Sequence, residues 1–144
     1  MPQSPGPEQS EIRWKQRFDN LNRALAQLQS ALEAHQAMPE NELIVIALIK
    51  AYEFSFELSW KTLKDLLAWN GVDARLPREV LKQAFATGLL DEGQIWIDML
   101  EQRNLMAHTY DQARALQAAE LITSHYWPHL QRLQNALEAR RETA

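Results

Sequence analysis

Large apolar residues recur at alternating steps of four and three near the start of the chain. They are Trp14, Phe18, Leu21, Leu25, Leu28 and Leu32. This 3.5-residue period places every member on one side of an α-helix, which is typical of a helix packed in a bundle. It predicts a helix over about residues 11–36. Helix breakers are rare beyond this point, because only three of the four glycines and three of the six prolines follow Ser10. We find no strand-like alternation, so the pattern predicts an all-α chain.

Two further helices are bounded by the next breakers. Pro39 ends the first helix, and a long helix is expected over residues 41–70, with Gly71 in a left-handed conformation just after it. Pro77 suits the first turn of a short third helix, because its missing N–H would have no partner there anyway. That helix is expected to end at Gly88.

The last part of the chain predicts two more helices. A fourth begins after Asp91, whose charge complements the helix dipole, and a fifth covers about residues 111–140. Pro128 lies inside the fifth helix and predicts a kink or break near Ser124. The expected architecture is an antiparallel four- to five-helix up-and-down bundle.

Composition divides the chain into two regions. Residues 1–10 contain three prolines and one glycine, and we expect them to be a disordered lead-in rather than a secretory signal. Residues 11–144 are expected to form a single domain, since 144 residues are enough for one core and few for two. The longest apolar run, from Leu43 to Ile49, is far shorter than a membrane span, so no membrane association is expected.

The expected long helix is more apolar than one partner helix would require. Its main apolar face comprises Val45, Leu48, Ile49, Tyr52, Phe56, Trp60 and Leu63. Phe54, Leu58 and Trp69 point elsewhere, and this surplus indicates an oligomer interface. The polar positions form one narrow stripe that includes Glu57 and Lys61, four residues apart. We interpret that pair as part of a solvated face, with a contact to a partner enzyme left open.

Composition also excludes several kinds of chemistry. The chain has no cysteine, which rules out thiol catalysis, Cys-ligated zinc and disulfides, and which fits a reducing cytoplasm. Its net charge of −4 provides no overall basic field, so any RNA contact must come from a local patch. Its four glycines include no phosphate-binding loop, so we expect no nucleotide cofactor, and any nucleotide transfer must be done by another protein.

Chemically capable side chains are densest where the fourth helix is expected to end. Arg103, Asn104, His108 and Tyr110 lie there within eight residues. On an ideal helix Arg103 and Tyr110 share one face, about 20° apart, and Asn104 and His108 lie within about 40°. Arg103 and His108 are instead separated by about 140°. If they act together, the helix must loosen before His108, or a second chain must bring its own copy alongside.

This set suits cleavage of a phosphodiester in RNA. An arginine offers donors to the oxygens on which charge grows in the transition state, and a histidine exchanges a proton near neutral pH. The attacking hydroxyl would belong to the RNA, so no metal is required and the product would be a 2′,3′-cyclic phosphate. The alternative is that Arg103, Asn104 and His108 only cap the helix and complement its dipole. The acidic neighbours weaken the case for RNA, because we expect Asp98, Glu101 and Asp111 to pair with Arg103 and repel phosphate.

The spacing Arg103-Asn104-x-x-x-His108-x-Tyr110 resembles the R-x4-H-x-Y motif of the HEPN superfamily. Specifically, it is similar to the HepT-like branch, also known as nucleotidyltransferase substrate-binding proteins. Two upstream blocks share this resemblance, residues 52–65 followed by Gly71, and residues 84–91 leading to Trp96. Together they cover nearly the whole chain, from about Glu11 to Leu137.

The resemblance implies a homodimer with two motifs facing a shared cleft, and a toxin that cleaves RNA without metal. It also implies a nucleotidyltransferase antitoxin that modifies the motif tyrosine with AMP. By position, Arg103 would stabilise the phosphate, His108 would be the acid and base, Asn104 would assist, and Tyr110 would be the AMP acceptor. A non-catalytic substrate-binding subunit of a nucleotidyltransferase is the alternative function, and the net charge of −4 favours it.

Two other groups of residues have simpler interpretations. His125 and His129 have the spacing of two zinc ligands on one helix, but Pro128 intervenes and no glutamate follows His125, so we interpret them as a polar helix edge. Trp60, Trp69 and Trp96 follow apolar helical periodicity, which predicts core or interface anchors rather than platforms for stacking bases.

Overall fold

The expected helices are all present, together with one segment of π-helix. The computed structural model describes residues 7–108 and 111–143. Its elements are α1 (Pro7–Ala37), α2 (Glu42–Trp69), α3 (Pro77–Ala86), α4 (Gly93–His108), α5 (Gln112–Leu121), the π-helix η1 (Ile122–Tyr126) and α6 (Trp127–Thr143). No β-strand occurs in these described ranges, so the all-α prediction is confirmed.

Local sequence signals set the helix ends. The side chain of Asn41 caps α2, and Pro77 occupies the first turn of α3. Gly71 and Gly88 follow α2 and α3 with φ of 86° and 85°, a left-handed conformation that glycine adopts without steric cost. The first helix begins at Pro7, four residues earlier than expected, so the end of the predicted disordered lead-in is helical, and the rest of it lies outside the described residues.

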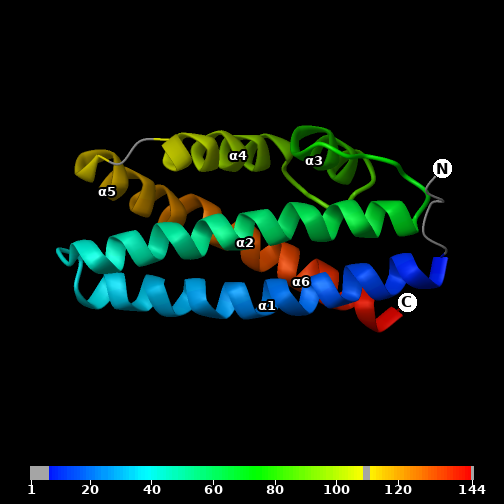
Figure 1. The fold of residues 1–144 in the computed structure, drawn as a ribbon, viewed down its shortest axis with the longest axis horizontal. Coiled ribbons are helices and arrows are strands. Elements are labelled where there is room, and N and C mark those ends of the chain that lie inside the picture. Colours follow the sequence, from blue (N-terminus) through cyan, green and yellow to red (C-terminus); the bar gives the residue numbers. More distant parts are fainter. Residues whose placement is uncertain (1–6, 109–110, 144) are drawn as a thin grey trace.

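The long segments alternate in direction (Figure 1). Helices α1 and α2 form an antiparallel hairpin, α4 runs back along α2, and the rod α5–η1–α6 crosses behind the hairpin toward the end where α1 begins. The short α3 precedes α4 at that same end. This is an up-and-down bundle of four long segments with one short insertion, as the sequence predicted.

The core is built from the apolar faces that the periodicity identified. All six members of the α1 seam are buried, and so are Tyr52, Phe56 and Trp60 of α2. Trp96 of α4 is 1% exposed and stacks on Phe56, with ring centroids 6.2 Å apart. Trp69 is partly buried against the core, so the three tryptophans are anchors as predicted. Phe54 is 63% exposed on the outer face of α2.

The predicted kink in the last helix is a π-helical turn. Pro128 has no N–H to donate to the carbonyl of Ser124, and its ring crowds that carbonyl. The chain responds by widening just before the proline, where the N–H of Trp127 bonds to the carbonyl of Ile122, five residues back. The π-helical turn separates α5 from α6. Leu116 of α5 was expected on the apolar side of the helix, but it is 46% exposed because alanines form the inner face of α5.

Candidate functional site

A buried hydrogen bond fixes α4 against α2 one turn before Arg103. The hydroxyl of Tyr52 donates to the carbonyl of Met99 at 2.8 Å, and both residues are fully buried. Burial is the main cause that raises the pKa of the Tyr52 hydroxyl well above its ordinary value, with smaller contributions from Tyr126 and Glu53, while Arg103 opposes the shift. The hydroxyl therefore stays protonated and remains a donor through the neutral pH range.

The guanidinium of Arg103 lies between α4 and α2. Its Nη2 donates to Oε2 of Glu57 at 3.0 Å, and its Nη1 donates to Oδ1 of Asn104 at 3.3 Å. The Arg103 side chain is 35% exposed. These two contacts leave further N–H groups of the guanidinium for a ligand, since arginine carries a planar fork of donors. The structure thus brings together two of the four predicted site residues, Arg103 and Asn104.

Glu57 is the residue that sequence reasoning missed. Its carboxylate accepts from Arg103 and from Nε1 of Trp60, at 3.1 Å, and lies 3.3 Å from Nζ of Lys61. The predicted pair with Lys61 is therefore present, but it is one contact of three. The signal available in the sequence was the position of Glu57 inside the family-like block of α2, whereas its contact with Arg103, 46 residues away, depends on how α2 and α4 pack.

The expectation that acidic neighbours pair with Arg103 is wrong. Glu101 lies 3.5 Å from Arg78, and Asp98 accepts a hydrogen bond from Gln94. Asp111 caps α5 by accepting from the N–H of Ala113 at 2.9 Å. Each carboxylate thus has another partner, and Arg103 points instead toward α2.

The conformation of α4 near His108 bears on how Arg103 and His108 could act together, through a loosened helix or through a second chain. The helix stays α-helical through His108, so it does not loosen before that residue. The roughly 140° between Arg103 and His108 therefore persists, and a composite cleft between two chains stays a prediction. The side chain of His108 and the whole of Tyr110 lie outside the described residues.

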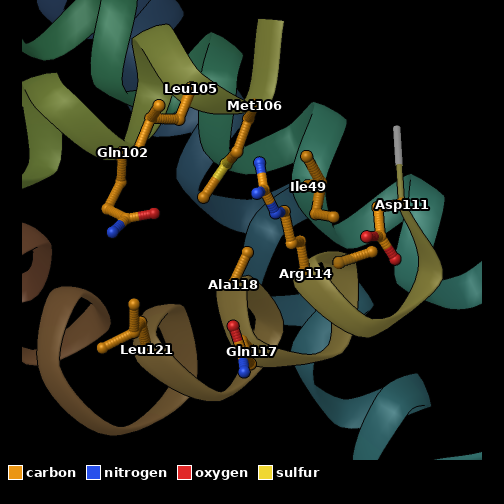
Figure 2. A pocket seen from close by; sticks show the side chains of 10 residues that line it. Ile49, Gln102, Leu105, Met106, Asp111, Arg114, Gln117, Ala118 and Leu121 are labelled. Carbon is orange, nitrogen blue, oxygen red and sulfur yellow. The ribbon is translucent and has the colours of Figure 1, made fainter. Parts of the chain in front are cut away.

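A cavity of about 380 Å³ opens between α2, α4 and α5, beside this helix end (Figure 2). Gln102 and Met106 project into it from α4, Arg114 and Ala118 from α5, and Ile49 from α2. Apolar side chains form most of its wall, and Arg114 and Asp111 add opposite charges at one side.

The two histidines with zinc-ligand spacing lie in different environments. His125 is exposed in η1, whereas His129 is half-buried with its Nε2 3.8 Å from a carboxylate oxygen of Glu92. Within the described residues, no cluster of three or more His, Cys, Asp or Glu is arranged to hold a metal ion. In the same ranges, no helix combines the length and the apolar character needed to cross a membrane.

Comparison with known families identifies the class of this bundle. Residues 16–139 match the family described as nucleotidyltransferase substrate binding protein like, and the chain belongs to this family. The match covers the bundle from α1 to α6, including the helix that carries Arg103 and His108. It confirms the resemblance drawn from the motif and the upstream blocks.

Individual relatives extend this assignment. The chain is 29% identical over 80 residues to the probable ribonuclease HepT of Haemophilus influenzae, a match that spans 52% of this chain and about half, 55%, of that relative. A protein of known structure from Thermus thermophilus is 26% identical, with a TM-score of 0.67 over 84% of this chain and 98% of its own. The tri-AMPylated HEPN toxin of Shewanella oneidensis, solved in complex with MNT antitoxin, shares the fold with a TM-score of 0.72 at 11% identity, covering 88% of this chain and 96% of that one.

Proposed function

We propose that this protein is a metal-independent RNA endonuclease and the toxin of a toxin–antitoxin pair, acting in the cytoplasm. The observation that carries the proposal is the placement of Arg103, which is half-exposed on α4 and oriented by Glu57 and Asn104 within two helical turns of His108. The similarity to a probable ribonuclease, and the family to which the chain belongs, support the same assignment.

In this mechanism the 2′-hydroxyl of the RNA attacks the adjacent phosphorus. His108 takes the proton of that hydroxyl or gives one to the departing 5′-oxygen, as a group that titrates near neutral pH. Arg103 stabilises the negative charge that grows on the phosphate oxygens, and Asn104 holds the guanidinium in place. The bond between phosphorus and the 5′-oxygen breaks, and the products are a 2′,3′-cyclic phosphate and a 5′-hydroxyl. DNA lacks the attacking group and is inert by this route.

The two active groups come together across a homodimer in this proposal. Along α2, the exposed side chains of Leu43, Ile46 and Phe54 lie within about 80° of one another around the helix. They form an apolar stripe that the exposed Lys50 interrupts and that ends one turn before Glu57. A second copy packed on this stripe buries apolar area that a monomer leaves in water. Because Glu57 holds Arg103, the same packing brings two motifs toward one cleft, so that His108 of one protomer can serve Arg103 of its partner.

The antitoxin in this proposal is a nucleotidyltransferase that transfers AMP to Tyr110. The similar Shewanella toxin is described as tri-AMPylated and in complex with MNT antitoxin, which supports this form of control. A nucleotide on Tyr110 adds a negative charge and bulk beside the motif, where the RNA backbone needs to lie, so modification opposes substrate binding.

The second candidate is a non-catalytic substrate-binding subunit of a nucleotidyltransferase. The net charge of −4 favours it, because the protein lacks a general attraction for RNA. The ion pair between Arg103 and Glu57 favours it as well, since it neutralises part of the charge that a phosphate would meet.

The two candidates are separated by an RNA cleavage assay in the presence of EDTA. The protein is first confirmed free of AMP by mass spectrometry, and Arg103→Ala and His108→Ala are compared with it. The nuclease proposal expects cleavage with cyclic-phosphate ends from the unmodified protein and loss of cleavage in both variants. No cleavage of any RNA by unmodified protein would instead support the binding subunit, and cleavage abolished by EDTA would refute the metal-free mechanism.

A further inference from the structure

The cavity between α2, α4 and α5 has the size and lining of a small-ligand site. Its volume of about 380 Å³ falls within the range of roughly 300–1,000 Å³ typical of ligand pockets. Ile49, Met106, Ala118 and Leu121 supply apolar surface that suits a flat, aromatic group. Methionine adapts easily to such a group because its side chain is flexible and polarisable.

Two polar side chains at the cavity have unused hydrogen-bonding capacity. The amide of Gln102, which is half-buried, and the guanidinium of Arg114 form no hydrogen bond or ion pair with other described residues. Arg114 extends from α5 toward α4, and it lines the cavity together with Met106 (Figure 2). Other arginines behave differently, since each of five pairs with a carboxylate of another segment of the fold: Arg17, Arg78, Arg103, Arg132 and Arg141.

The combination of these groups defines the chemistry of the ligand. An amide offers one acceptor and two donors, which match the edge of a nucleobase, and an arginine binds phosphate. Asp111, whose second carboxylate oxygen remains available beyond its cap, lies at the rim and can accept from an exocyclic amino group. An apolar slot, an amide and an adjacent cation together fit a nucleotide better than a simple anion or a fatty ligand.

The cavity also adjoins the turn of α4 that carries the proposed catalytic residue, Arg103. Gln102 and Arg103 are consecutive on α4, so their side chains diverge by about 100° around the helix. Gln102 faces the cavity, whereas Arg103 faces Glu57 on α2. An RNA strand that crosses α4 can therefore place one nucleotide against Gln102 and the neighbouring nucleotide against Arg103.

We propose that this cavity is a nucleotide subsite that takes one unpaired base of the RNA strand beside the scissile phosphate. The base inserts between Met106 and Leu121, Gln102 reads its edge, and Arg114 binds the flanking phosphate. This assignment rests on the proposed nuclease function and adds a source of base preference to it, since single-stranded RNA is read through unstacked bases.

The first test measures cleavage by Gln102→Leu and Arg114→Ala. Matched controls are Gln131→Leu and Arg140→Ala, which alter exposed residues of α6 whose side chains also lack a partner among the described residues. We expect Arg114→Ala to raise KM about tenfold with little change in kcat, because a phosphate contact away from the reacting bond contributes to binding. Gln102→Leu is expected to change the base preference at the cleavage site by about tenfold, read by sequencing the products. Circular dichroism checks that each variant is folded.

The second test measures binding without cleavage, by fluorescence anisotropy with a 2′-O-methyl oligonucleotide and with free AMP as probes. Weaker oligonucleotide binding by both cavity variants, but not by the controls, supports the subsite. Variants that cleave and bind like their controls overturn the subsite and leave the nuclease proposal standing. If the protein cleaves no RNA but both cavity variants bind the oligonucleotide more weakly, the subsite stands and the nuclease proposal is overturned. Free AMP that binds as tightly as the oligonucleotide overturns the assignment to an RNA strand.

Discussion

Replacing Glu57 with alanine removes the carboxylate that three side chains share. The indole of Trp60 loses its acceptor at 3.1 Å, which costs about 1 kcal/mol in a partly buried position. The ion pairs with Arg103 and Lys61 contribute less than buried pairs would, because the side chains of Arg103 and Lys61 are 35% and 39% exposed and solvent screens them. We therefore expect the free energy of unfolding to fall by about 1–2 kcal/mol, which leaves the protein folded.

The effect on cleavage is expected to be larger than the effect on stability. Without Glu57 the guanidinium of Arg103 loses its anchor on α2, and a misplaced catalytic group costs about 10- to 100-fold in rate. Glu57→Gln keeps an oxygen acceptor of the same shape, so it should recover most of that loss. The assay is single-turnover cleavage of an RNA oligonucleotide with EDTA present, run beside urea unfolding of each variant.

Glu53→Ala is the matched control for this prediction. Glu53 lies one turn earlier on α2, pairs with Lys50 at 3.3 Å, and its removal changes the net charge by the same amount. Equal cleavage by Glu57→Ala and Glu53→Ala would show that Glu57 does not position Arg103. Faster cleavage by Glu57→Ala would also refute the reasoning, because it would show that the Glu57 carboxylate competes with the phosphate for Arg103.

Three other predictions follow from the same structure. Tyr52→Phe should lower the free energy of unfolding by about 1 kcal/mol at pH 8, because it removes the hydrogen bond to Met99. Folding raises the pKa of Tyr52, so the free energy of unfolding of the wild type should fall above about pH 10 more steeply than that of the variant. Equal dependence on pH for the two proteins, in urea unfolding from pH 8 to 11, would contradict this. Phe54→Glu should convert the proposed dimer into a monomer in light scattering, whereas wild-type protein that is already monomeric at micromolar concentration would exclude the composite cleft. Tyr110→Phe should keep cleavage activity and resist modification by the nucleotidyltransferase, and AMP labelling that persists would place the acceptor elsewhere.

The helices and much of the core could be predicted from the sequence because their causes are local. The 3.5-residue period of the α1 seam identifies its buried side, and Gly71, Gly88 and Pro128 mark the points where helices end or widen. The candidate residues Arg103 and Asn104 could also be named, because they form a motif along a single helix.

Which side chains of different helices contact one another could be known only from the tertiary structure. Whether Arg103 meets Asp98, Glu101 or Glu57 depends on the rotation and axial shift of α4 against α2, which many side chains set jointly. The same packing leaves Arg114 without a carboxylate partner among the described residues and opens a cavity between three helices. The sequence alone determined which side chains each helix presents, because helical period is a property of neighbouring residues. The tertiary structure decided which of them meet, because those pairs are brought together only by packing.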